Sequence, residues 1–223
     1  MYSKGEVIGY IWQYSRYYGD LLGQSNLIYT EEIGAHSALI NLFNLTEIIL
    51  KSKIDNYNIN LYRAVEKLHS DGIINDVEAK FLNDKNTGIR GIRNKFSHAN
   101  LSKYNFRFEE EPNVLYPATE ISTCEILYKK LSDIIYNIIL KVVSSDLIVN
   151  LEFDLDNDIN NCKFTIEELA VENILRSKGV DYRSFGGEWT EMTEAKKYIL
   201  AENASDVNVL KSILANVFVK GEV

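Results

Sequence analysis

Proline is nearly absent from this chain, and its two prolines, Pro112 and Pro117, lie five residues apart. Proline interrupts a helix because it lacks a backbone N–H and because its ring clashes with the preceding turn. The chain on either side of the pair is therefore free to form long helices. Its 223 residues are enough for one large domain, or for one domain with a smaller appendage. We predict an all-α fold with an exposed loop at the two prolines.

Apolar side chains recur at helical spacing before and after that loop. The clearest pattern covers residues 31–53 and predicts an amphipathic helix that faces a core. The same criterion predicts four further helices, over residues 7–29, 60–71, 75–98 and 119–144. Gly88 and Gly91 should loosen the helix over 75–98. Together the five helices predict an antiparallel bundle that occupies residues 1–149.

The composition changes near residue 150, where we place a domain boundary. Residues 150–223 are expected to form a small, mostly helical C-terminal extension. Alternating apolar residues between Ile148 and Leu155 indicate a short strand, and Thr165, with two glutamates shortly after it, indicates the start of a helix. Beyond it we expect a loop over residues 184–189 and helices over 190–203 and 206–219.

The formal net charge of −8, taken over the whole chain, disfavours nucleic acid as a partner. The charge is unevenly distributed, because the window from Lys85 to Arg107 contains six basic residues and no acidic one. A solvated basic helix face would explain this window, and so would a local anion-binding site. The second interpretation favours selected RNA over indiscriminate binding of polyanions.

The basic window contains the run Arg93-Asn94-Lys95-Phe96-Ser97-His98. Arginine matches a phosphate with its fork of N–H donors, and histidine is the side chain best suited to move protons near neutral pH. Arg63 and His69 have nearly the same spacing, so spacing alone is weak evidence. On a regular helix Arg93 and His98 would point about 140° apart. Two copies packed around a two-fold axis would bring both residue types into one cleft, which predicts a homodimer.

Arg93, the polar Asn94 and His98 stand late in a helix that is followed by a loop and a long last helix. This arrangement resembles the signature of the HEPN superfamily (higher eukaryotes and prokaryotes nucleotide-binding). Some members also carry an acidic and a basic residue one turn apart in an upstream helix, which Glu47 and Lys51 match. The resemblance covers about residues 30–145 and leaves the C-terminal extension unexplained.

The resemblance implies a metal-independent endoribonuclease, a dimeric effector of antiviral defence, abortive infection or toxin–antitoxin growth arrest in prokaryotes. His98 would assist attack of the ribose 2′-hydroxyl or protonate the leaving 5′-oxygen, Arg93 would stabilise charge on the phosphate, and Asn94 would orient either group. The products would be a 2′,3′-cyclic phosphate and a 5′-hydroxyl. The remaining expected site residues are Lys95, Arg90 and Lys103, which would attract RNA, and Glu47 and Ser97, which would support the site.

A second interpretation stays open. Some superfamily members have lost catalysis, so this chain could be a module that binds a nucleotide or a protein within a defence complex. The acidic net charge favours that alternative. Under either interpretation, the C-terminal extension could recruit an antitoxin or another partner of a defence complex.

Other function classes find little support. No Walker loop or dinucleotide-binding glycine pattern is present, and we expect neither a cofactor nor a metal. The aspartates at 154, 156 and 158 imitate the start of a calcium loop, but Ile159 stands where the turn glycine is needed. Cys124 and Cys162 are expected to be inert small hydrophobic side chains. With no apolar stretch long enough to span a bilayer and no signal-peptide pattern, we expect a cytoplasmic protein without membrane contact.

Overall fold

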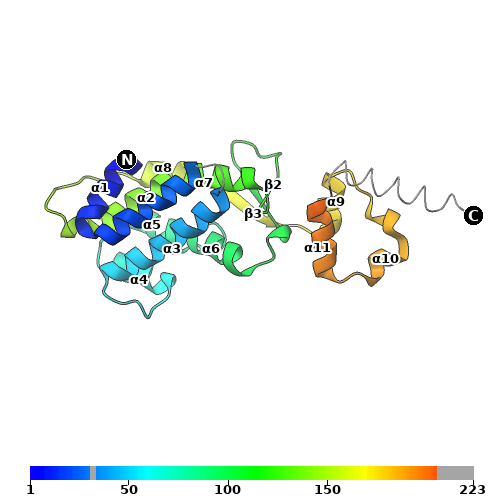
Figure 1. The fold of residues 1–223 in the computed structure, drawn as a ribbon, viewed down its shortest axis with the longest axis horizontal. Helices are drawn as coiled ribbons and strands as arrows, with labels where there is room; N and C mark the ends of the chain where they lie inside the picture. Colours follow the sequence, from blue (N-terminus) through cyan, green and yellow to red (C-terminus); the bar gives the residue numbers. More distant parts are fainter. Residues whose placement is uncertain (31–33, 205–223) are drawn as a thin grey trace, which may run out of the picture.

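The computed structural model describes residues 1–30 and 34–204, and these are mostly helical (Figure 1). The helices of this part are α1 (Lys4–Tyr14), α2 (Arg16–Thr30), α3 (Ala35–Lys53), α4 (Leu61–Ser70), α5 (Asp76–Asn83), α6 (Ile89–His98), α7 (Ile121–Val143), α8 (Asp156–Asn161), α9 (Val171–Ser177), α10 (Gly186–Glu191) and α11 (Glu194–Asn203). The expectation of a mostly helical chain is confirmed, and a small sheet is the departure from it. Among the residues described, no helix combines the length and the apolar character that a bilayer-spanning segment needs.

The helical body is built around α3 and α7, which pack along each other. Both helices carry the broad apolar faces that the sequence predicts, and α7 buries residues on almost every side. Helices α1 and α2 cover this pair, α4 packs on α3, and α5 packs on α4. The helices predicted over 31–53, 60–71 and 119–144 correspond to α3, α4 and α7, although residues 31–33 lie outside the described part.

Two of the predicted helices are each interrupted. The helix predicted over 7–29 is broken at Ser15, whose backbone is extended (φ −153°, ψ 113°), so α1 and α2 form a helical hairpin. Gly19 permits the close packing of this hairpin, because a Cβ there would lie 2.7 Å from Trp12 Cα. The helix predicted over 75–98 is broken at Asp84, whose carboxylate accepts hydrogen bonds from Asn86 N and Thr87 N. Helicity resumes only at α6, with Gly88 as its N-cap.

Gly91 fixes the position of α6 against the turn that precedes it. A Cβ on Gly91 would lie 2.3 Å from the carbonyl oxygen of Lys85, which is backbone and cannot swing away. We therefore expect Gly91→Ala to lower the free energy of unfolding by about 1–3 kcal/mol, the usual cost of overpacking. Gly23→Ala in α2 is the matched control. Its Cβ would meet only Ile8 Cγ2 at 3.9 Å, so it should raise stability by about 0.5–1 kcal/mol in the same urea titrations. Equal effects of the two substitutions would contradict this account.

A three-stranded antiparallel sheet closes one end of the helical body. Its strands are β1 (Tyr104–Phe108), β2 (Tyr116–Pro117) and β3 (Phe164–Glu168), in the order β2-β1-β3. Tyr104 of β1 pairs with Glu168 of β3, and Phe108 pairs with Phe164. The sheet therefore joins two segments that are some sixty residues apart in the chain.

The sheet corrects three predictions. The loop predicted at Pro112 and Pro117 is not irregular throughout, since Tyr116 and Pro117 form β2, and no strand forms between Ile148 and Leu155. The helix expected to begin at Thr165 is wrong, because that residue lies inside β3. Phe164 and Ile166 alternate with polar residues and lie against the main core, and this two-residue period outweighs the helix-start signal of the glutamates.

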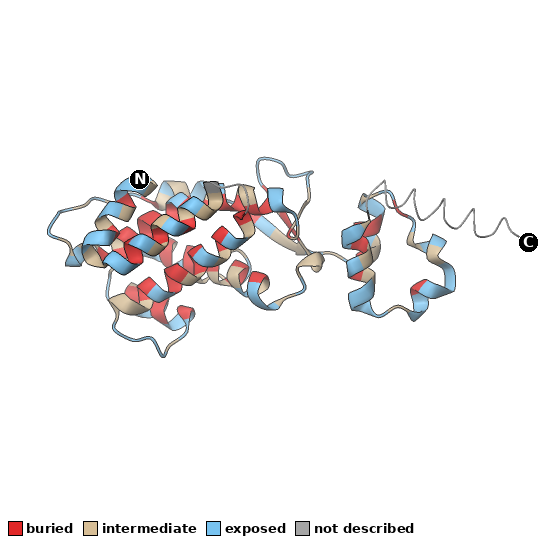
Figure 2. Cartoon of the chain, in the orientation of Figure 1, coloured by how far each residue is buried: buried red, intermediate tan, exposed pale blue. Residues whose placement is uncertain are grey.

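A second, smaller core forms at the C-terminal end of the described chain. Figure 2 shows its buried residues in a unit separate from the helical body. They come from α9, α10 and α11 and the segments between them: Val171, Ile174, Leu175, Val180, Trp189, Tyr198 and Ala201. Trp189 was expected in a loop but lies in α10, where its ring stacks on Phe185. Residues up to Ile166 still pack on the main core, so the second core begins later than the predicted boundary at residue 150. The helix predicted over 206–219 lies outside the described residues.

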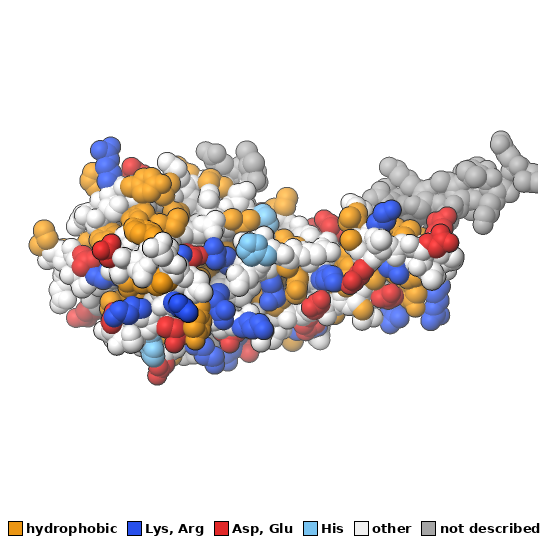
Figure 3. All heavy atoms as spheres, turned by 90° about the horizontal axis from the view of Figure 1, so that it is seen from below, with side chains coloured by type: hydrophobic (Ala, Val, Ile, Leu, Met, Phe, Trp, Pro, Cys, Tyr) orange, Lys and Arg blue, Asp and Glu red, His pale blue; other side chains and the backbone are white. Residues whose placement is uncertain are grey.

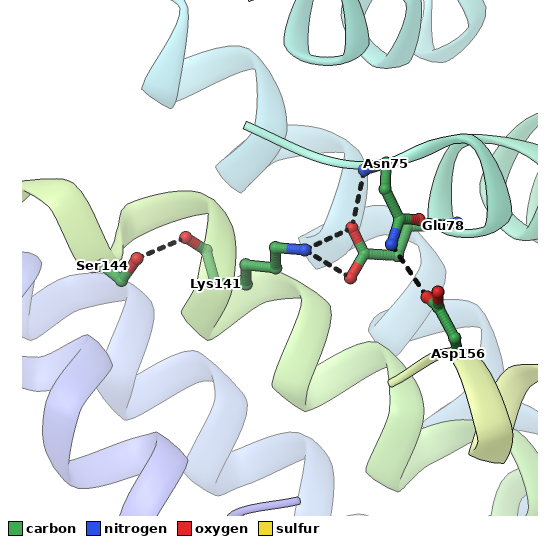
Figure 4. Close-up of polar contacts among 5 residues, drawn as sticks. All are labelled: Asn75, Glu78, Lys141, Ser144 and Asp156. Carbon is green, nitrogen blue, oxygen red and sulfur yellow. Dashed lines mark hydrogen bonds and ion pairs between the residues drawn. The ribbon is translucent and has the colours of Figure 1, made fainter. Parts of the chain in front are cut away.

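A buried ion pair ties α5 to α7 (Figure 4). Glu78 is 1% exposed, and both its carboxylate oxygens accept from Lys141 Nζ at 2.8 Å. Glu78 also completes a capping box with Asn75 at the start of α5, and Asn75 donates to Asp156 at the start of α8. The Glu78 carboxylate thus links α5 to α7, and its capping partner Asn75 links α5 to α8.

Candidate functional site

Helix α6 displays the Arg93 to His98 run on the border between core and solvent. Ile89, Ile92 and Phe96 are buried and hold α6 against α3. Because these apolar residues recur at helical spacing, the residues between them must face the edge or the outside. Arg93 is accordingly half-buried, whereas Asn94, Ser97 and His98 are exposed.

Arg93 is held by α3. Its Nη2 lies 2.7 Å from Oε2 of Glu47, and its Nε donates to Oδ1 of Asn44 at 3.4 Å. The other carboxylate oxygen of Glu47 lies 2.5 Å from Lys51 Nζ, one turn further along α3. We call Asn44, Glu47, Lys51 and Arg93 the α3–α6 cluster. The structure thus brings together Arg93 and the acidic–basic pair that the sequence analysis singled out.

The α3–α6 cluster carries a net positive charge, because one carboxylate faces two cations. The side chains of Glu47, Lys51 and Arg93 are 11%, 14% and 27% exposed, so water screens these charges only in part. Arg93 has five N–H donors, of which one donates to Asn44, while Nη2 lies at ion-pair distance from Glu47; a guanidinium has further donors with which it can bind a phosphate. The ion pair fixes the orientation of the guanidinium before any ligand arrives.

His98 is the last residue of α6, and its side chain makes no hydrogen bond or ion pair with any residue that the structure describes. A second histidine lies close to this end of the helix, since the ring of His36 on α3 packs on Phe96 with centroids 5.3 Å apart. Figure 3 shows histidine side chains close together on one face of the molecule, with Lys and Arg side chains nearby on the same face. Proton-transfer groups and cations therefore share this face.

The other predicted RNA-binding residues have structural partners. Arg90 donates from Nε and Nη2 to the carbonyl oxygen of Asn83, at 3.0 and 2.8 Å, and so caps the end of α5. Lys95 lies over the ring of Tyr104, and burial lowers the pKa of its ammonium group. Lys103 donates to Glu194 of α11 at 2.7 Å, which raises the pKa of Lys103. Arg90 is thus the least available of the three to RNA.

Two residues near the site were missed by sequence reasoning. Asn44 precedes Glu47 by three positions and Lys51 by seven, which places all three on one face of α3, so the helical spacing could have found it. His36 gave no such signal, because its approach to Phe96 depends on how α3 and α6 pack. The pair Arg63 and His69, which has nearly the same spacing, differs from Arg93 and His98 in its contacts. His69 is bonded to Asp76, and Arg63 has no partner on α3.

Comparison with protein-family models, with curated proteins and with solved structures finds no match to this chain. Within the described residues there is also no group of three or more His, Cys, Asp or Glu side chains arranged to hold a metal ion. The aspartates that imitate a calcium loop are divided between the approach to α8 and its first turn, and Asp156 is engaged by Asn75. The chemistry proposed for the site therefore rests on its own side chains.

Proposed function

We propose that this chain is a metal-independent endoribonuclease of HEPN type, which acts as a homodimer in prokaryotic defence or growth arrest. The observation that carries the proposal is the contrast between the two ends of the motif. Arg93 is oriented by Glu47 within a net positive cluster, whereas His98, on the same helix, is exposed and has no partner among the described residues. The first is suited to hold a phosphate and the second to exchange protons with solvent and substrate.

The reaction needs no group beyond these residues and the RNA. The ribose 2′-oxygen attacks the adjacent phosphorus and loses its proton to an imidazole, while the bond from phosphorus to the 5′-oxygen breaks and that oxygen gains a proton. Arg93 stabilises the charge that develops on the non-bridging oxygens. The chain then ends in a 2′,3′-cyclic phosphate, and the leaving strand begins with a 5′-hydroxyl.

A dimer supports this chemistry better than a monomer. On the regular helix α6, Arg93 and His98 point about 140° apart, so one copy cannot direct both at one phosphate. Two α6 helices related by a two-fold axis supply two arginines and two histidines to a shared cleft. One imidazole then accepts the 2′-hydroxyl proton while the other protonates the 5′-oxygen.

The test is cleavage of total RNA and of tRNA by the purified full chain in EDTA, followed by analysis of the ends. We expect cleavage to persist in EDTA, and the new 5′ ends to be labelled by polynucleotide kinase without prior phosphatase treatment. Cleavage that EDTA abolishes and magnesium restores would overturn the mechanism.

The alternative function is a binding module without catalysis. It is favoured by the engagement of Arg93 with Glu47, which could serve only to join α3 to α6. Such a module would bind a nucleotide or a protein and leave RNA intact in the same assay. The second core around Trp189 could recruit an antitoxin or another defence protein under either function.

A further inference from the structure

A cleft separate from the α3–α6 cluster opens between α5, the sheet and the end of α8. Its volume is about 620 Å³, which lies within the range of small-molecule sites, about 300–1,000 Å³. None of the four residues of the α3–α6 cluster lines it. The cleft therefore belongs to neither the proposed reaction nor its substrate contacts.

The inner wall of the cleft is apolar and rich in aromatic rings. Phe81 comes from α5, Phe108 from β1 and Phe164 from β3, and all three belong to the main core while also lining the cleft. The rings of Phe108 and Phe164 meet edge to face at 6.2 Å between centroids. These rings are anchored in the core and are only 2–8% exposed, so they give the cleft a fixed apolar wall that an apolar group can contact.

Some of the charged residues at the mouth of the cleft have hydrogen-bond or ion-pair partners within the protein, and others have none or only a weak one. Arg107 is paired with Glu167, and Asp84 accepts hydrogen bonds from its own turn, chiefly the N–H of Thr87. Asp76 is bonded to His69. The acidic groups at the mouth other than Glu109 are thus occupied by partners within the protein.

Two lysines remain for a ligand. The side chain of Lys80 makes no hydrogen bond or ion pair with any described residue, although it lies close enough to Asp84 to contribute to the lowered pKa of that carboxyl group. Lys163 is 3.8 Å from Glu109, and both side chains are more than half exposed. An exposed pair at that distance is weak, so Lys163 can turn to another anion at little cost.

We propose that this cleft binds a small molecule with an aromatic ring system and one acidic group, the rings contacting the apolar wall formed by Phe81, Phe108 and Phe164 and the acidic group meeting Lys80. A ligand of this class uses the apolar wall and the unengaged cation at once. A purely apolar ligand would leave the lysine without a partner, and a polyanion would meet Glu109 and Asp76 at the mouth.

The probe for the test is 8-anilinonaphthalene-1-sulfonate, which combines fused rings with one sulfonate. We expect its fluorescence titration to give one site per chain, and Lys80→Glu to weaken binding at least tenfold. Lys85→Glu is the matched control: it makes the same charge change at an exposed residue outside the cleft, and it should leave the affinity unchanged. Equal affinities of the two variants would overturn the proposal.

Cys162 provides a readout confined to this cleft. Its thiol lines the wall and is half-buried, whereas Cys124 is 1% exposed. Burial raises the pKa of the Cys162 thiol to about 11, so its alkylation by N-ethylmaleimide is slow enough to follow by peptide mass mapping. Saturating probe should slow alkylation of Cys162 several-fold. If the rate does not change, the dye is bound at another apolar surface and the proposal is wrong.

Discussion

Replacing His98 by alanine is expected to reduce RNA cleavage by about two to four orders of magnitude, the usual contribution of a general acid or base. Stability should barely change, because the side chain is exposed and has no described partner. Initial rates on a defined RNA in EDTA, together with thermal unfolding midpoints of both proteins, check the two halves of this expectation. His69→Ala is the control, since His69 also lies in the last turn of a helix but belongs to α4 and not to α6.

Whereas His98→Ala should lose cleavage alone, the companion variant Arg93→Ala is expected to lose both RNA cleavage and stability. It should also abolish cleavage, but it leaves Glu47, which is 11% exposed, with Lys51 as its single cationic partner, so stability should fall as well. Equal cleavage by wild type and both variants would show that the activity arises from another site or a contaminant. Loss of cleavage in Arg93→Ala alone would support a structural role for the motif.

The parts of the fold that the sequence predicts well are those with an uninterrupted helical period. Helices α3 and α4 each bury one broad apolar face, and α7 buries residues on almost every side; in all three, apolar residues recur at helical spacing without a break. The breaks were harder to see. Ser15 ends α1 through an extended backbone, and Asp84 interrupts the helix predicted over 75–98 by bonding to its own turn, while apolar residues on either side continue a helical spacing.

The sheet could not be predicted with the same reasoning, because its stability is non-local. Strand β3 is short, and its two glutamates resemble a helix start; only pairing with β1 makes the extended conformation favourable. In the candidate site, too, the local pattern could be predicted and the contacts between elements could not. Spacing along α3 and α6 predicts which faces carry Glu47, Lys51 and Arg93, but the contacts between these faces depend on the packing of the helices. The cleft beside α5 gave no sequence signal, since its walls come from three distant stretches of the chain, residues 76–88, 107–112 and 159–165.

Replacing Lys141 by methionine is expected to lower the free energy of unfolding by about 3–5 kcal/mol, which is the cost of leaving a buried charge without its partner. Methionine keeps much of the length and apolar character of the lysine stem, so the loss reports the ammonium group rather than a cavity. Glu78, at 1% exposure, would then keep only its contact with Asn75 N, and the junction of α5, α7 and α8 would lose its centre. Urea denaturation followed by circular dichroism measures the change.

The double variant Lys141→Met with Glu78→Gln decides whether the cost comes from the orphaned carboxylate. The neutral amide of glutamine can still accept from Asn75 N, so most of the lost stability should return, and the double-mutant cycle should show strong coupling between the two positions. Lys129→Met, on an exposed position of the same helix, is expected to change stability by less than about 0.5 kcal/mol. If the double variant is no more stable than Lys141→Met alone, the lysine stem and its packing, rather than the ion pair, hold α5 on α7. In that case the three-helix junction is apolar in origin, and the buried carboxylate serves chiefly to cap α5.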